Sequence, residues 1–353
     1  MHADKGVRII SFWYIILSIL VFGFLVFVHE LGHFICARAC GVGVHEFSIG
    51  MGPKIISWVS KKTGIRYSVR ALPFGGFVSM VGEDEESDRE DALSRKSVWK
   101  RILIVVSGPV MNLLLGFIAM TVMVSSAEAL YGTQVLYPIN GNVQISDGSG
   151  LEQSDMILKV GRVNVHTRSE LVYEVMRQGI EAVDITVIRE GETILVEDVL
   201  FPVVMEKGSL LGGIDFYANQ EPSTFGNIVK HIYYRSLSTV KMIVDSFVDL
   251  LTGRYGMEAV SGPVGITQTM GQAAAGGWSS FLYIFMVITI NLGVFNLFPI
   301  PALDGGRLLF LVIEAVTKRP VNKNVEAYIH LAGLVILFGF IIFVTFNDIL
   351  RLF

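Results

Sequence analysis

Long uncharged apolar stretches are the dominant pattern along the chain. They cover residues 9–28, 102–127, 281–299 and 331–346. The first stretch follows Lys5 and Arg8, but no small-residue cleavage site follows it, so we interpret it as a retained helix rather than a secretory signal. Each stretch approaches the roughly 20 residues that a helix needs to cross the bilayer, so the pattern predicts an α-helical polytopic membrane protein with about four transmembrane helices.

Shorter alternation of polar and apolar residues follows the first stretch. Residues 46–81 alternate in short runs around turns at Gly50, Gly64 and Pro73-Phe-Gly-Gly76, which predicts β-hairpins beside the first helix. The acidic run at 83–91 is typical of a solvated loop, and we assign it no chemistry. We therefore expect a membrane-associated β-hairpin region.

The middle of the chain has the composition of a soluble domain. Alternation at 155–165, helical spacing at 169–178 and a strand at 183–189 predict a small α/β module between residues 138 and 202. Residues 224–251 then repeat apolar positions at intervals of three and four, which is typical of an amphipathic helix at the extracytoplasmic face of the membrane.

Lys and Arg near the ends of the apolar stretches indicate orientation, because cytoplasmic loops carry the excess. Basic residues cluster between 38 and 101 and again between 318 and 323, so both segments should face the cytoplasm, although Lys5 and Arg8 argue against an outer N-terminus. The expected segments are a first transmembrane helix at 1–40, a cytoplasmic-side β region with an acidic loop at 41–101, a second helix at 102–128, an extracytoplasmic module at 129–205, an extracytoplasmic amphipathic region at 206–270, and the third and fourth transmembrane helices at 271–353.

Composition and charge narrow the class of protein. Hydrophobic residues make up 52% of the chain and charged residues only 17%, which excludes an ordinary soluble protein. The net charge of -4, from 28 basic and 32 acidic residues, argues against a nucleic-acid partner, whose phosphates require a basic excess. The only two cysteines, Cys36 and Cys40, exclude a disulfide framework, and we assign them to helix packing.

The strongest chemical motif is His29-Glu-Leu-Gly-His33. On a helix, positions i and i+4 share one face, so His29 and His33 can bind one Zn²⁺ while Glu30 reaches a water molecule as general base. The alternative is that the three polar residues only emerge at the cytoplasmic interface. Their position at the end of an apolar segment favours a functional site, because such residues are costly there unless they bind something or line a cavity.

A catalytic zinc site takes three ligands from the protein. Asp304 is the carboxylate near the third apolar stretch, and Pro299 and Pro301 break or kink the chain before it, so Asp304 can face a cavity within the membrane. We expect Asp304 to be the third ligand. From the residues alone this reading is nearly balanced by another, in which Asp304 is the N-cap of a following helix.

Together the motifs resemble those of the site-2 protease family of intramembrane zinc metalloproteases, most closely the bacterial regulator-of-sigma-E protease type. The matching motifs are His-Glu-x-x-His at 29–33, Gly108-Pro-Val-Met-Asn112, Asn-x-x-Pro-x-Pro-x-Leu-Asp-Gly at 296–305, Pro73-Phe-Gly-Gly76, Trp99-Lys-Arg101 and Ser261-Gly-Pro-Val-Gly-Ile266. The resemblance implies a Zn²⁺ enzyme with ligands His29, His33 and Asp304 and catalytic base Glu30. The residues that we expect to contact substrate are Asn112, Asn296, Pro299 and Pro301, together with the sheet at 46–81.

The same resemblance implies the partners and the location. The substrates would be single-pass transmembrane proteins, such as a pre-cleaved anti-sigma factor or a remnant signal peptide. The enzyme would cut them within the bilayer of the inner (plasma) membrane, with its active site near the cytoplasmic side. The module at 138–202 would be a PDZ domain. Ser154 and Gly161-Arg162 depart from the usual PDZ pattern, so a size filter is favoured over a receptor for peptide C-termini.

Two other classes of protein compete with a protease. A catalytically silent scaffold would recruit partners through the outer module, but it gives no role to the intact His-Glu-x-x-His motif. A transporter would also have broken helices and polar residues within the membrane. The chain has no detectable inverted repeat, however, and a transporter does not require Glu30. We expect His330, at the start of the fourth stretch, to lie at the interface rather than bind zinc.

Overall fold

The computed structural model describes residues 12–83, 87–138, 150–206, 209–254, 256 and 260–351. The chain divides into two compact units. The first comprises Met1–Ala119 and Ser261–Phe353, and the second comprises Met120–Val260.

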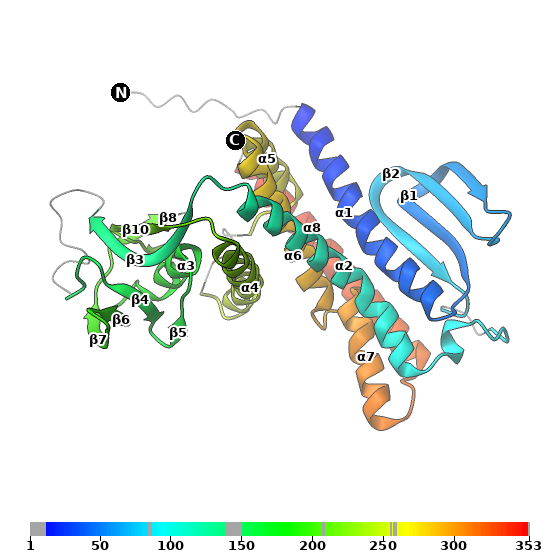
Figure 1. Cartoon of the computed structure of the whole chain (residues 1–353). Coiled ribbons are helices and arrows are strands. Elements are labelled where there is room, and N and C mark those ends of the chain that lie inside the picture. Colours follow the sequence, from blue (N-terminus) through cyan, green and yellow to red (C-terminus); the bar gives the residue numbers. More distant parts are fainter. Residues whose placement is uncertain are drawn as a thin grey trace. The chain divides into compact units, whose positions relative to one another are not determined.

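Four helices are long and apolar enough to cross a membrane (Figure 1). They are α1 (Phe12–Ala39), α2 (Val98–Ser125), α6 (Trp278–Leu297) and α8 (Lys323–Leu350). They overlap the four predicted apolar stretches, although residues 126–127 and 298–299 lie beyond the ends of α2 and α6, and residues 9–11 lie outside the described residues. The prediction of about four helices that are long and apolar enough to span a membrane is confirmed.

Small residues bring the helices of the first unit close together. A Cβ atom on Gly32 of α1 would lie 2.7 Å from Cγ of Met111 in α2. A Cβ atom on Gly293 of α6 would lie 3.0 Å from the carbonyl oxygen of Pro109, also in α2. Both distances are shorter than ordinary contacts, so glycine is required at these helix crossings, as is common in membrane helix packing.

The segment between α1 and α2 forms the predicted β-hairpin. Strands β1 (Val44–Val59) and β2 (Arg66–Met80) pair antiparallel, and both bend beside α1 (Figure 1). Phe47 pairs with both Tyr67 and Val78, while Trp58 also pairs with Tyr67. Because both strands bend, the sheet has four neighbouring segments, in the order 54–59, 66–70, 44–49 and 76–80. We call residues 76–80 the inner edge and residues 54–59 the outer edge; no other strand of the described chain pairs with either.

Shorter elements complete the first unit. They are the 3₁₀ turn η1 (Leu93–Arg95) and the helices α5 (Pro263–Ala275) and α7 (Asp304–Thr317). The N-terminus of α5 is held by α8, because Asp348 accepts a 2.7 Å hydrogen bond from the N–H of Gly265. Helix α7 begins directly after the Pro299–Pro301 segment, where the proline residues prevent α6 from continuing.

The second unit is built on a six-stranded antiparallel sheet. Its members are β3 (Leu130–Pro138), β4 (Met156–Val160), β5 (Val163–Asn164), β6 (Val183–Arg189), β7 (Glu192–Val199) and β10 (Phe216–Glu221). The order is β10-β3-β4-β6-β7, with β5 paired to β4, and a separate ladder joins β8 (Val203–Glu206) to β9 (Ser209–Gly212). The predicted strands and the helix α3 (Arg168–Gln178) are present. The sheet also extends beyond residue 205, because β10 pairs with β3. Residues 139–149, which begin the PDZ-like stretch, lie outside the described residues.

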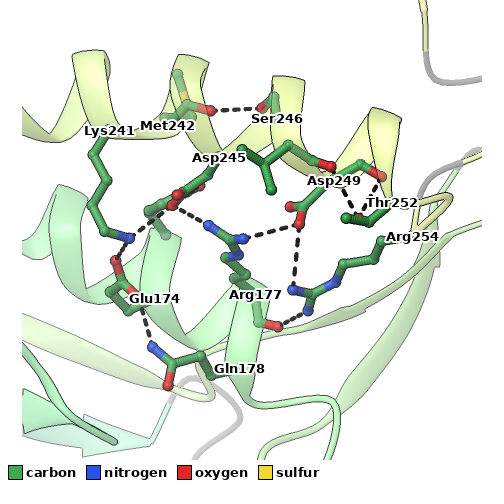
Figure 2. Close-up of polar contacts among 12 residues, drawn as sticks. Glu174, Arg177, Gln178, Lys241, Met242, Asp245, Ser246, Asp249, Thr252 and Arg254 are labelled. Carbon is green, nitrogen blue, oxygen red and sulfur yellow. Dashed lines mark hydrogen bonds and ion pairs between the residues drawn. The ribbon is translucent and has the colours of Figure 1, made fainter.

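The predicted amphipathic helix is α4 (Phe225–Leu251), and it packs on α3 through ion pairs (Figure 2). Arg177 of α3 bonds to Asp245 and, at 2.9 Å, to Asp249. Lys241 of α4 lies 2.7 Å from Glu174 and 2.8 Å from Asp245. We call this network the α3–α4 seam. It fastens the sheet module to α4 with alternating charges of both signs.

Candidate active site

Helix α1 places the predicted motif on one side of its last turns. His29 and His33 are one helical turn apart, and each is buried, with 8% of its surface exposed. Their Nε2 atoms are 3.2 Å apart. As the sequence predicted, the i, i+4 spacing directs both imidazoles to one point.

Asp304, at the first residue of α7, completes a triangle with these two nitrogen atoms. Its Oδ2 atom lies 3.0 Å from Nε2 of His29 and 3.2 Å from Nε2 of His33. Ligand atoms about 2.0–2.2 Å from a tetrahedral zinc ion lie roughly 3.3–3.6 Å apart. The triangle is within a few tenths of an ångström of the size that zinc requires.

Hydrogen bonding also fits a cation at this point. Oδ2 of Asp304 is buried and makes no aligned hydrogen bond, despite its ion-pair distances to the histidines. Nδ1 of His33 lies 2.8 Å from the carbonyl oxygen of Ile104, so Nδ1–H donates and Nε2 keeps its lone pair. Lone pairs that face one another in a buried site are repulsive unless a cation lies between them.

Asn112 of α2 contacts the other histidine. Its amide nitrogen lies 3.2 Å from Nδ1 of His29, while its buried Oδ1 has no hydrogen-bond partner. The oxygen and the nitrogen of an amide side chain are assigned from the hydrogen-bond partners of each atom. Turning the amide by 180° would let Oδ1 accept a hydrogen bond from Nδ1–H of His29, which would leave Nε2 with its lone pair. A metal-binding tautomer of His29 therefore requires Asn112 in the turned orientation.

Gly108 of α2 determines where the His33 ring lies. A Cβ atom added at Gly108 would overlap Nε2 of His33, closer than any real contact. The ring thus packs against bare backbone on one side and donates to Ile104 on the other. The sequence matched Gly108 only as part of a family motif, so its role in positioning His33 was not recognised.

Glu30 borders a cavity of about 660 Å³ together with the three candidate ligands. The inner edge of the hairpin, residues 76–80, lines the same cavity. A Cβ atom on Gly76 would lie 3.0 Å from Cγ of Glu30, so the strand passes directly beside the Glu30 side chain. The cavity brings together a candidate base, a candidate metal site and a strand edge.

The turn before Asp304 is held by a histidine of α8. Ala302 has a left-handed backbone, with φ at 74°, and its N–H donates a 3.0 Å hydrogen bond to Nδ1 of His330. Leu303 is the N-cap of α7, and Asp304 is the first helical residue, so Asp304 does not occupy the N-cap position. His330 lines the cavity but is outside the triangle of ligand atoms. Its link to Ala302 was not predicted.

Two ion pairs attach α7 to the rest of the unit. Arg307 pairs with Glu83, just beyond the inner edge, and both residues line the cavity. Glu314 pairs with Arg101 at the start of α2. Only Gly305 and Gly306 of α7 are buried, so these charges supplement weak apolar packing.

The remaining predicted residues lie farther from the triangle. The amide of Asn296 donates a 2.9 Å hydrogen bond to the carbonyl oxygen of Leu292, within its own helix. Pro299 is exposed, and Pro301 packs against Gly333 of α8, where an added Cβ would overlap it. None of the three is among the described residues that line the cavity. Their predicted contact with substrate stays a prediction.

Known proteins provide an independent comparison. The profile of peptidase family M50 matches residues 17–340. A protein of Clostridium acetobutylicum named as a zinc metalloprotease is 33% identical over 346 residues, which cover 96% of this chain and 98% of the relative. The regulator of sigma-W protease RasP of Bacillus subtilis is 29% identical over 423 residues, which cover 96% of this chain and 99% of RasP. A match over nearly the whole length of both relatives shows the family: the chain belongs to peptidase family M50, the site-2 protease family, and is a zinc metalloprotease.

Proposed function

We propose that this zinc metalloprotease hydrolyses peptide bonds within transmembrane segments, with His29, His33 and Asp304 as zinc ligands and Glu30 as catalytic base. The observation that carries the proposal is the convergence of three lone-pair donors, 3.0–3.2 Å apart, beside Glu30 in one cavity. The helix that bears three of these four residues is apolar enough to span a membrane.

Bound zinc would polarise the scissile carbonyl group and increase the acidity of a water molecule. Glu30 would accept the proton of the attacking water and deliver it to the nitrogen of the departing amine. Asn112 and Ile104 would hold the two imidazoles in the tautomers that leave Nε2 available. The Glu83–Arg307 pair would keep α7, and therefore Asp304, at a fixed distance from the inner edge.

The substrate must unwind, because a helix hides its amide groups in its own hydrogen bonds. The inner edge could bind an extended segment by strand addition, since it borders the cavity and no described strand occupies its open side. Asn296, Pro299 and Pro301 belong to the proposal as further contacts of the substrate. A contribution from Asn296 requires release of its present bond to Leu292.

We extend the proposal to orientation and substrate class. The basic residues of 38–101 and 318–323 support a multi-pass protein of the plasma membrane with its active site near the cytoplasmic side. The name of the Bacillus subtilis relative, a regulator of sigma-W protease, supports single-pass membrane substrates such as trimmed anti-sigma factors. Remnant signal peptides are a second candidate class.

The module predicted at 129–205 completes the proposal as a PDZ-like size filter outside the membrane. Its support is the antiparallel sheet with α3, and the left-handed Ser154, φ at 78°, where the PDZ pattern has a glycine. A filter predicts that replacing the module by a short flexible linker speeds cleavage of a substrate with a large outer domain. Cleavage of a pre-trimmed substrate should stay unchanged. Loss of cleavage of the trimmed substrate would instead indicate a peptide receptor.

The central test compares Glu30→Gln with the parent enzyme in proteoliposomes that contain a trimmed single-pass reporter. The amide keeps the shape of the side chain but cannot accept the proton, so zinc content should stay near one per chain while cleavage is abolished. The Glu90→Gln variant, at an exposed position before α2, is the matched control and should retain cleavage. Near-normal cleavage by Glu30→Gln would exclude Glu30 as the base. Absence of zinc and cleavage from the parent would favour a scaffold.

A further inference from the structure

The outer edge of the hairpin is apolar on both faces. Successive residues of a strand point to opposite sides, yet Ile55, Ile56, Trp58 and Val59 are 66%, 58%, 53% and 52% exposed. An ordinary surface strand exposes polar residues on at least one face. Both faces of the outer edge must therefore contact an apolar medium.

Hydrogen bonding limits how deeply this edge can enter that medium. Residues 54–59 pair only with 66–70, so half of their backbone groups have no partner in the described chain. Open sheet edges do not occur in hydrocarbon, because each unsatisfied N–H or C=O group costs several kcal/mol there. Trp58, stacked on Tyr67 at 5.7 Å, is a side chain typical of the membrane interface. The outer edge fits the headgroup region, where water and lipid oxygens supply partners.

Positive charge is concentrated at the same place. Between Glu46 and Glu83 the chain carries five basic residues and no acidic one. Glu46 binds two of them, with 2.9 Å ion pairs to Lys54 and Arg70. Burial raises the pKa of Glu46, but hydrogen bonds from Lys54, Ser68 and Arg70 outweigh it and lower the pKa to about 2. Glu46 is therefore ionised near neutral pH, and its negative charge is already paired with Lys54 and Arg70.

The other three basic residues surround the turn at the end of the outer edge. Lys61, Lys62 and Arg66 are exposed, and none has an acidic partner in the part of the chain that the structure describes. Near a membrane surface, each Lys or Arg gains about 1 kcal/mol from anionic lipids. We infer that the outer edge and this basic turn bind the headgroups of anionic phospholipids. The inference rests on the proposed function as a membrane protease and on the predicted membrane association of the hairpin.

Trp58 can report the contact directly. The chain has four tryptophans, so replacing Trp13, Trp99 and Trp278 by Phe leaves Trp58 as the single fluorophore. This parent protein is placed in phosphatidylcholine nanodiscs that contain phosphatidylglycerol, with bromine on the acyl chains of one lipid at a time. Brominated phosphatidylglycerol should quench Trp58 about 3- to 10-fold more per mole than brominated phosphatidylcholine. High salt should reduce this preference.

Charge variants identify the source of the preference. Lys61→Gln, Lys62→Gln and Arg66→Gln together should bring the quenching ratio to about 1 while quenching by phosphatidylcholine persists. The matched control neutralises Lys318, Arg319 and Lys323, which run from the end of α7 to the first residue of α8, and should keep the preference. Zinc content shows that both triple variants are folded at the active site.

Three outcomes would overturn the inference. Equal quenching by both lipids in the parent would mean that the surface does not select anionic headgroups. A preference that survives the triple variant at 61–66 would mean that these residues do not create it. Quenching by neither lipid would also exclude the membrane location of the hairpin. Cleavage of the reporter in the same nanodiscs tests the proposed protease function separately.

Discussion

Two clusters of polar side chains in this protein differ in whether their buried polar atoms have hydrogen-bond or ion-pair partners. At the candidate metal site, Oδ2 of Asp304 and Oδ1 of Asn112 are buried without a hydrogen-bond partner. In the α3–α4 seam, Arg177, Lys241, Glu174 and Asp245 each contact at least one opposite charge, and no buried atom of these four lacks a partner in the described chain (Figure 2).

The contrast distinguishes polar groups that hold the protein together from polar groups that await a ligand. A complete network of ion pairs stabilises the contact of two helices, and removing one member leaves another charge exposed to the low dielectric of the interior. Buried polar atoms without partners destabilise the protein, and a cation that binds them removes this cost. We expect changes at the two clusters to affect different measurable properties.

The largest effect should follow removal of a proposed zinc ligand. His33→Ala or Asp304→Ala leaves two protein ligands, so zinc content should fall well below one per chain, and cleavage should fall about 10³-fold or more. Zinc is measured by mass spectrometry after exhaustive dialysis. Cys36→Ala, one turn farther along α1, is the control and should keep both properties. Full zinc content in Asp304→Ala would remove Asp304 from the ligand set.

A methyl group beside the ligand should have the next largest effect. Gly108→Ala places a Cβ atom against the His33 ring and should weaken zinc binding about 10- to 100-fold by misaligning Nε2. The control is Gly339→Ala in α8, where no atom lies within 4 Å of the added Cβ. Competition with a zinc chelator measures both affinities. Equal affinities would show that the ring can shift without cost.

Breaking the seam should destabilise the second unit without removing zinc. Arg177→Met leaves Asp245 and Asp249 without their shared partner and should cost about 2–3 kcal/mol, less than for a fully buried pair because the Arg177 side chain is 18% exposed. Arg162→Met, at an exposed position, should cost little. Hydrogen exchange of the α3 and α4 amides reports the loss. Unchanged exchange in Arg177→Met would mean that apolar contacts alone hold α4.

The smallest effect concerns pH. Burial raises the pKa of Asp245, but hydrogen bonds from Arg177, Lys241 and Tyr173 outweigh it and lower the pKa below its usual value. A lowered carboxyl pKa stabilises the fold above the unfolded pKa of about 3.9, and the contribution is lost as pH falls through the folded pKa. Exchange protection of α3 and α4, corrected for intrinsic rates, should be flat from about pH 8 to 5 and fall below about pH 4. A decline already near pH 6 would indicate a histidine instead.

The sequence predicted the part of the candidate site that a single helix determines. His29, Glu30 and His33 are related by the geometry of one α-helix, so their spacing was sufficient. Asp304 lies 271 residues beyond His33, and the residues alone could not distinguish a ligand from an N-cap. Only the contact between α7 and α1 separates these readings, and no local pattern encodes that contact.

The features that escaped prediction all depend on such distant contacts. Gly108 was one glycine among 36, and its importance arises from the ring that packs on it. His330 was expected at the interface, and its bond to Ala302 follows from how α8 approaches the turn before Asp304. Strand β10 ends in three consecutive polar residues, at 219–221, and has little strand-like alternation, so only its pairing with β3 identifies it as part of the sheet.

The outer edge of the hairpin also affects how the purified protein should behave. A long exposed strand with apolar side chains is a template for pairing with a second chain, and Lys54 with the preceding Pro53 is the main local protection. In a detergent without charged headgroups, two copies can join along residues 54–59. A dimer observed only in such a detergent would then be an artefact of delipidation, and adding anionic lipid should return the protein to monomers.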